Sequence, residues 1–525
     1  MTLKKQKLSL FFILVTLAAV LCGCSDGKQE KGPDESIPPA ESGTAEEPVY
    51  GGSVVVGIQQ DIDSLDPHKA VAAGTKEILF NIYEGLVKPD KDGNLVPAIA
   101  ESYTVAPDGK SCTFVLRDNV TFHNGNPVTA EDVVYSIKRC AGLLKNAEPT
   151  VVVEKALSHI IEVNTPDEKT VEVVLDEPNT EIAGYLTCAV IPSDSKDLEK
   201  NPVGTGPFKF QSYTPLESLI VVNNDAYYGQ KAYLDEVTFK MVANTDAAFM
   251  DLQSGSIDIY AYLTSDQAAQ LEGTFRIEKG TLNLVQGIFL NNKSELFSDK
   301  RVRQALNYAV DRQGILDMVG NGDGHILESD MFPGFGIYYS KEAEMTYERD
   351  VEKAKELLRE AGYPEGISFT MIVPSNFQYH VSTAQVAVEQ LKEAGIHVTL
   401  KTVEETTWLS DVYTDRNYDA TLYGLAAKVV VPGRVMERYA SEASNNFINY
   451  SNPEYDKVLE KALKATDQQE KIDCYKELQQ MLADDAASVY LQDPAHLIAV
   501  NPKLKGYTFY PVFVQDMSTI YYTAE

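Results

Sequence analysis

Residues 120–133 read Val120-Thr121-Phe122-His123-Asn124-Gly125-Asn126-Pro127-Val128-Thr129-Ala130-Glu131-Asp132-Val133. The alternation of Val120 and Phe122 is typical of a half-buried strand, and we expect Phe122 in the core. Gly125 stands where a turn would need a glycine. Thr129 is predicted to cap a helix that follows it directly, because acidic residues occupy the first turn, where the helix dipole favours them.

Strand and helix patterns interleave on either side of this stretch. A continuous apolar run over 52–58 predicts a strand buried on both faces. Alternating apolar residues over 112–116 and 171–175 predict half-buried strands. A helix predicted to end at Gly395 is followed directly by a strand-like segment over 396–400. This helix–glycine–strand order indicates an α/β fold.

The N-terminal region has the composition of a secretory leader and a tether. After a basic start, an apolar run over 8–21 leads into Leu21-Cys22-Gly23-Cys24, which resembles the cleavage motif of bacterial lipoproteins. The resemblance predicts a signal peptide over 1–23 and a lipid on Cys24; ordinary signal-peptide cleavage with an unmodified cysteine is the alternative. Proline, glycine and acidic residues predict a disordered linker over 24–50.

Charge and length exclude several classes of protein. The formal net charge of −31 would repel nucleic acid, so no nucleic-acid partner is expected. No apolar stretch after residue 23 reaches the roughly 20 residues that span a bilayer. We therefore expect membrane contact through the lipid anchor only. About 475 residues follow the linker, enough for two or three cores.

The motifs of catalysis and metal binding are missing from the sequence. The seven histidines show no ligand spacing, and the cysteines beyond Cys24 form no CxxC. Each of those cysteines is expected in the core; the alternative is that two of them form one disulfide. Residues 193–196 satisfy SxxK, but the chain holds no SDN or KTG, so a chance match is favoured. No catalytic residue, metal site or cofactor is predicted, and the chain is not expected to be an enzyme.

Several further segments occur in one order along the chain. They are Ser64-Leu65-Asp66-Pro67-His68-Lys69, Ile82-Tyr83-Glu84-Gly85-Leu86-Val87, 97–102, 108–117, Val203-Gly204-Thr205-Gly206-Pro207-Phe208, 302–312 and 449–456. Together with residues 120–133, this ordered set resembles the family 5 extracellular solute-binding proteins of ABC importers. That family includes dipeptide-, oligopeptide- and nickel-binding proteins.

The resemblance implies an α/β, bilobal periplasmic-binding-protein-like fold of type II, in the large cluster that carries an extra subdomain. Two lobes joined by a hinge would close on a ligand. The expected boundaries are 51–85, 200–282 and 495–525 for lobe I, 86–199 for the extra subdomain, and 283–494 for lobe II.

The implied function is capture of a small ligand, above all a di- or oligopeptide, at the extracytoplasmic face of the bacterial cell membrane. An ABC permease and ATPase complex would receive the ligand, and the protein is expected to be a monomer. The alternatives are a non-peptide solute (an anionic metabolite, a metal chelate or an oligosaccharide) and, from another class, a hydrolase or an adhesin. Sugars rank lower because Trp408 is the chain's one tryptophan.

The resemblance also places the ligand-facing positions in two segments. They are Val71, Ala72, Ala73 and Gly74 in the first, and Leu422, Tyr423, Gly424, Leu425, Ala426 and Lys428 in the second. In peptide-binding members an aspartate at the position of Lys428 holds the peptide's ammonium group. A lysine there would prefer a carboxylate or phosphate; the alternative is that Lys428 points to solvent.

Overall fold

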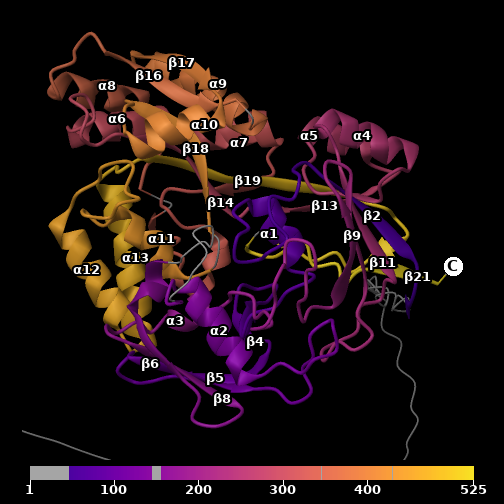
Figure 1. Cartoon of the computed structure of the whole chain (residues 1–525). Helices are drawn as coiled ribbons and strands as arrows, with labels where there is room; N and C mark the ends of the chain where they lie inside the picture. The colour runs from indigo at the N-terminus through magenta and orange to yellow at the C-terminus, as the bar shows by residue number, and fades with distance from the viewer. Residues whose placement is uncertain are drawn as a thin grey trace, which may run out of the picture. The chain divides into compact units, whose positions relative to one another are not determined.

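The computed structural model describes residues 47–144, 155–343, 346–375, 377–427, 430–512 and 514–524 (Figure 1). The predicted signal peptide, Cys24 and Lys428 lie outside these ranges, as does the linker up to residue 46. All elements named below belong to the unit Glu47–Glu525.

An interior strand of the largest sheet is β2 (Ser53–Ile58), which was predicted from its apolar run. It pairs in parallel with β11 (Glu236–Met241) on one side and β12 (Ile259–Tyr260) on the other. Val54 and Val56 are fully buried. Strands with neighbours on both edges and packed faces need apolar residues throughout, which explains the run.

A single long strand, β19 (Val489–Val500), connects two halves of this sheet (Figure 1). Its C-terminal half pairs with β12 and with β13 (Arg276–Thr281). Its N-terminal half pairs with β14 (Leu284–Leu290) and β15 (Gly324–Ile326). The partners change between Pro494 and Ala495. The first half-sheet also contains β9 (Phe208–Thr214) and β10 (Ser218–Asn223); the second contains β16 (Ile367–Pro374), β17 (Ile396–Val403) and β18 (Ala420–Ala426).

The backbone crosses between the half-sheets a second time at Leu282 and Asn283, between β13 and β14. The Leu282 amide donates to the Pro494 carbonyl at 2.9 Å, so the two crossings lie side by side. The Leu284 amide donates to the Asp493 carboxylate at 3.2 Å. Asn283 has a φ of 56°, a left-handed conformation that asparagine tolerates. The two crossings therefore form one hydrogen-bonded junction.

Helices pack against both half-sheets. In the second half, the helix α9 ends before Gly395, whose φ of 77° turns the chain directly into β17, as predicted. The helices there are α6 (Lys300–Ala309), α7 (Arg312–Gly320), α8 (Val351–Glu360), α9 (Gln378–Glu393), α10 (Glu405–Trp408), α11 (Pro432–Met436), α12 (Pro453–Lys464) and α13 (Gln468–Asp484). The first half carries α1 (Ala73–Leu79), α4 (Thr245–Ser254) and α5 (Ser265–Leu271).

A separate four-stranded antiparallel sheet has its own core. Its strands, in spatial order, are β5 (Ala100–Val105), β6 (Ser111–Leu116), β8 (Thr170–Leu175) and β7 (Ile160–Asn164). Along β6 and β8, buried apolar side chains alternate with half-buried residues, which confirms the predicted strands. The helix α2 (Ala130–Cys140) begins with a capping box between Thr129 and Asp132, which confirms the predicted cap. A second short helix, α3 (Ile182–Tyr185), shares this core.

The predicted strand at Val120 and Phe122 is wrong. Both side chains are buried, as the alternation suggested, but they belong to no strand. The Phe122 amide donates to the Asn126 carbonyl, and Gly125, with a φ of 87°, turns the chain between them. A tight turn also buries alternate side chains, so the pattern alone did not separate the two structures.

Two minor sheets complete the described elements. One pairs β3 (Val87–Pro89) with β4 (Leu95–Pro97); the other holds β1 (Pro48–Val49), β21 (Tyr521–Thr523) and β20 (Leu504–Lys505). Among the described residues, Cys112, Cys140, Cys188 and Cys474 are all free thiols. Within the same residues, no helix is long and apolar enough to cross a membrane, and no cluster of metal-ligating side chains occurs.

Candidate functional site

The first predicted ligand-facing segment is a loop whose backbone is bound by one carboxylate. Asp63 Oδ2 accepts hydrogen bonds from the Val71 amide at 2.7 Å and the Ala72 amide at 3.1 Å. Partial burial alone would raise the pKa of Asp63, but hydrogen bonds from Thr75 and these two amides lower it. Val71 is left 64% exposed. The helix α1 starts immediately afterwards.

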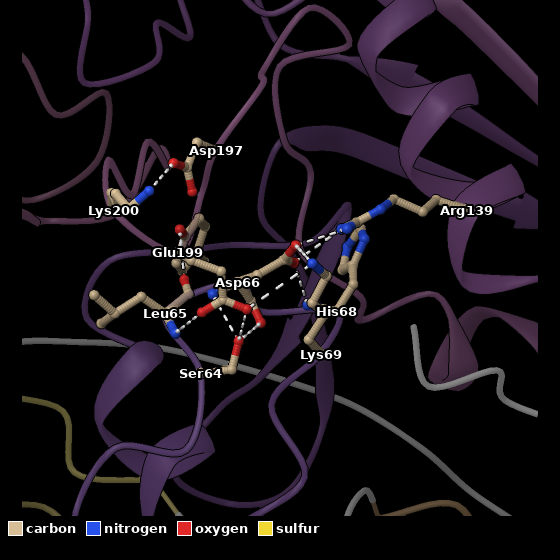
Figure 2. Close-up of polar contacts among 10 residues, drawn as sticks. Ser64, Leu65, Asp66, His68, Lys69, Arg139, Asp197, Glu199 and Lys200 are labelled. Carbon is tan, nitrogen blue, oxygen red and sulfur yellow. Dashed lines mark hydrogen bonds and ion pairs between the residues drawn. The ribbon is translucent and has the colours of Figure 1, made fainter. Parts of the chain in front are cut away.

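The marker sequence at 64–69 precedes this loop, and polar contacts fix its position (Figure 2). Arg139 of α2 donates to both oxygens of Asp66, at 2.8 and 2.6 Å, and both side chains are buried. Burial opposes the charge of Asp66, yet Arg139 and the His68 amide bring its pKa below the usual value. A bidentate buried pair of this kind fixes orientation as well as position. The loop is thereby attached to the four-stranded subdomain.

Glu199 adds a second support on the other side of the marker sequence (Figure 2). Its carboxylate accepts from the Ser64 hydroxyl at 2.9 Å and from the Leu65 amide at 3.2 Å. The Lys69 ammonium lies 4.0 Å from both Glu199 and Asp66. These contacts are all internal to the protein, so the marker sequence is a structural element that positions the loop.

The second predicted segment is the strand β18. Leu422 is fully buried in the core of the second half-sheet, so its side chain acts in packing. Tyr423 stacks on Trp408 with ring centroids 4.0 Å apart, and the Trp408 indole N–H donates to the Thr421 hydroxyl. Trp408 is only 1% exposed. It is therefore not available to stack on a sugar, which agrees with the low rank given to sugars.

Gly424 gives this strand its close packing on α9. A Cβ atom at Gly424 would lie 2.8 Å from Cε1 of His380 and 2.9 Å from Cδ1 of Leu284. His380 is buried and hydrogen-bonded to Gln286 at 2.8 Å, and burial lowers its pKa to about 3. A neutral, fixed imidazole therefore lies against the strand.

The helix α1, which begins within the first predicted segment, and the strand β18, which contains most of the second, reach the junction between the half-sheets. Ala426, at the end of β18, pairs with Leu284 of the crossing. On the other side, Glu77 of α1 shares a cavity of about 20 Å³ with Leu282 and Asn283. Lys428 follows directly after the described strand and lies outside the described residues, so its predicted role stays a prediction.

The cavity beside Glu77 was not predicted from the sequence. Its other lining residues are His496, Tyr507, Thr508, Phe509, Tyr510, Val512 and Val514. The Tyr262 hydroxyl donates to Glu77 Oε2 at 3.0 Å, and burial raises the pKa of Glu77 to about 7. Tyr379 of the second half-sheet is close enough to contribute to the raised pKa of Tyr262. The cavity thus lies where residues of both half-sheets meet.

The fold and this junction define a class of protein. Residues 94–447 match the family model described as bacterial extracellular solute-binding proteins, family 5. The chain belongs to this family, which confirms the family and the α/β binding-protein fold predicted from the ordered motifs.

Individual relatives agree over nearly the whole chain. The oligopeptide-binding protein AppA of Bacillus subtilis is 27% identical, over 97% of each chain. The structure of the periplasmic binding protein DppA from Helicobacter pylori, in complex with the peptide STSA, superposes with a TM-score of 0.78 at 27% identity, covering 91% of this chain and 99% of that one. The binding protein AgaA from A. tumefaciens R10, in complex with agropinic acid, gives 0.75 at 28% identity, with 90% and 99% covered.

Proposed function

We propose that this chain captures a di- or oligopeptide outside the cytoplasm and delivers it to the permease and ATPase of an ABC importer. The main support is that two separate elements meet at one junction: α1, which follows the loop bound by Asp63, and the strand β18. The fold is similar to that of a binding protein in complex with a peptide. No described residue cluster offers a metal site, and the sequence holds no hydrolase motif.

The proposal includes hinged closure of two lobes, with lobe I at 51–85, 200–282 and 495–525, the extra subdomain at 86–199, and lobe II at 283–494. The junction supports it, because the partners of β19 change between Pro494 and Ala495 and the other crossing is at Leu282 and Asn283. Two adjacent backbone crossings can absorb a rotation with few changes elsewhere.

The proposed ligand-facing residues are those of the two segments. Val71 to Gly74 would contact the ligand from lobe I, and Tyr423 to Ala426 from lobe II, with Leu422 supporting them from the core. Lys428 would face an anionic group of the ligand. Changing Lys428 to Asp should then weaken binding of the native ligand by about ten- to a hundredfold, because a charge-assisted hydrogen bond is lost.

Membrane attachment is proposed through a lipid on Cys24, as the motif at residues 21–24 predicts. Replacing Cys24 with Ser should leave the precursor unprocessed or release the protein from the membrane fraction. A correctly cleaved variant that stays in the membrane fraction would refute the lipid anchor while leaving ligand capture untouched.

An anionic solute is the second candidate ligand. The specific observation in its favour is that AgaA, bound to agropinic acid, is as similar to this chain as the peptide-bound DppA is. Calorimetry with the full chain in detergent separates the candidates. Saturable binding of peptides of two to five residues supports the proposal, whereas binding of agropinic acid with no heat from any peptide would replace it with the second candidate.

A further inference from the structure

We propose that the cavity beside Glu77 binds a primary ammonium group of the ligand. This inference rests on the proposed function, since it assigns one chemical group of the captured ligand to one place at the junction. The ammonium could belong to a peptide's N-terminus or to a lysine side chain.

The cavity brings together hydrogen-bond acceptors that lack matching donors. Glu77 is 4% exposed and receives one hydroxyl hydrogen bond from Tyr262. The second acceptor is Nε2 of His496, which is buried and has no partner among the described residues. Because the other ring nitrogen of His496 hydrogen-bonds the Ala261 backbone, Nε2 carries a free lone pair. An ammonium group has three donors and no acceptor, which suits this set.

Gln515 lies next to Glu77 and can supply a third acceptor through its Oε1. The side chain is 3% exposed, neither its Oε1 nor its Nε2 has a close hydrogen-bond partner among the described residues, and its side-chain amide lowers the pKa of Glu77 against the effect of burial. The backbone fixes it there: the Gln515 amide donates to the Glu77 carbonyl at 3.3 Å, and Asn81 Nδ2 donates to the Gln515 carbonyl at 2.7 Å. The last turn of α1 therefore holds the C-terminal segment against the cavity.

Among the residues that the structure describes, no cation balances the charge of Glu77. Within the described part of the chain it forms no ion pair, in contrast to the buried Asp66, which has Arg139. A buried carboxylate without a partner is costly in its ionised form, and its pKa rises accordingly. A ligand cation would remove that cost. A cationic group should therefore bind here more tightly than a neutral group of the same size.

The walls of the cavity also favour a cation. The rings of Tyr507, Phe509 and Tyr510 line it, and Phe509 packs edge-on against His496 with centroids 5.9 Å apart. Aromatic faces attract cations, most strongly where water is excluded. The volume of about 20 Å³ accommodates a group the size of one water molecule, such as an ammonium head, and excludes a ring or a guanidinium.

The location gives such binding a structural consequence. Asn283, in one of the two crossings, donates to the Tyr510 carbonyl at 2.6 Å, and both residues line the cavity. An ammonium group held by Glu77 would therefore contact the junction itself, where the proposed lobes rotate.

The test uses the full chain in detergent and calorimetry with three probes: tri-alanine, N-acetyl-tri-alanine and N-acetyl-Ala-Ala-Lys. In the wild type, tri-alanine should bind about ten- to a hundredfold more tightly than its acetylated form. The substitution Glu77→Gln should abolish that difference and leave the acetylated peptide unaffected. Asp330→Asn, which removes another buried acid that does not line the cavity, should preserve the difference.

The other outcomes distinguish failure of the ammonium site from failure of the proposed peptide binding. Recovery of tight binding with N-acetyl-Ala-Ala-Lys assigns the site to a side-chain ammonium, and failure to recover assigns it to the N-terminus; both support the inference. Equal binding of tri-alanine and its acetylated form by the wild type, or a preference that survives Glu77→Gln, overturns the inference alone. No binding of any peptide overturns the proposed function.

A second measurement, on the wild type, tests the ammonium site if the Glu77→Gln variant does not fold. Only the ionised carboxylate holds an ammonium group, so wild-type affinity for tri-alanine should fall below about pH 7 by up to tenfold per pH unit, and that for the acetylated form should not. The titratable groups facing Glu77 are Tyr262, Tyr507 and His496, and none of them changes charge between pH 5 and 8. Parallel pH profiles for the two probes would overturn the inference.

Discussion

Gly424 shows how one residue sets the packing behind the candidate site. Any side chain there would press on the fixed ring of His380 and on Leu284 of the crossing. We expect Gly424→Ala to lower the free energy of unfolding by about 1–3 kcal/mol, because both neighbours are confined. Urea denaturation measures this effect.

Gly320 provides the matched control for that substitution. It ends α7, and a Cβ atom added there meets nothing within 4 Å. Gly320→Ala should therefore be neutral or stabilise the protein by less than about 1 kcal/mol. An equal loss of stability in both variants would show that the contact with His380 is not the cause.

Asp330 is a buried acid that makes stability depend on pH. Burial raises its pKa to about 7, and the Arg438 charge and the Tyr439 hydroxyl lower it only in part. Because the folded pKa lies above the usual value of 3.8, the contribution of Asp330 is fully present at low pH and is lost as pH rises through about 7. Tyr490 and Tyr455 also face it and do not ionise in this range.

Asp330→Asn should remove that dependence. Between pH 5 and 8 the wild type should lose stability relative to the variant, on the order of 2 kcal/mol. Thermal unfolding of both proteins across this range measures the difference. A constant difference in stability at all pH values would contradict the raised pKa.

At the scale of elements, local signals were readable from the sequence and distant pairings were not. The strand β2 and the helix α2 were predicted because an apolar run and a capping box lie within a few consecutive residues. The pairing of β19 with both half-sheets left no such signal, since its four partner strands lie more than 150 residues before it in the sequence. Hydrogen bonding between distant strands is a property of the fold and not of any one segment.

The pair Asp66–Arg139 joins the loop of the site to the helix α2 (Figure 2). Arg139→Ala should cost about 3–5 kcal/mol, because Asp66 would remain buried without its partner. The exposed pair Lys169–Asp118 is the control, and Lys169→Ala should cost less than about 1 kcal/mol. Denaturant unfolding compares the two. Similar costs in both variants would contradict a special role for the buried pair.

At the scale of the whole molecule, a buried carboxylate lies among the contacts between the subdomain and helices of the second half-sheet. Glu181, next to α3, accepts from the Gly433 amide at 3.1 Å and the Tyr475 hydroxyl at 2.8 Å, and Lys471 lies 3.7 Å away. These contacts span the proposed extra subdomain and lobe II. Opening of the lobes as proposed would break them.

Glu181→Ala should therefore shift the protein towards an open state. Ligand affinity should fall about tenfold, although Glu181 is not among the proposed ligand contacts, because closure contributes to binding. Glu177→Ala, at an exposed position four residues away, should have no effect. Calorimetry with a bound peptide measures both variants; unchanged affinity in Glu181→Ala would mean that this contact does not contribute to closure.

The candidate site was only partly predictable from the sequence, because the residues that form it, like the paired strands, come from distant parts of the chain. The resemblance indicated the segments at Val71 and Tyr423. The elements α1 and β18 reach the junction through Glu77 and Ala426, and ligand contact by the two segments stays a prediction. The cavity beside Glu77 could not be found, since its partners at Tyr262, His496 and Gln515 lie at least 185 residues away in sequence. An isolated glutamate in a helix carries no sign that the fold buries it.

The central claim is that the protein captures a peptide, and the most direct measurement is mass spectrometry of small molecules released from the natively purified full chain. We expect peptides of a few residues, in roughly equimolar amount and carrying at least one free primary amine. Release of a non-peptide solute alone, together with no binding of added di- to pentapeptides, would contradict it.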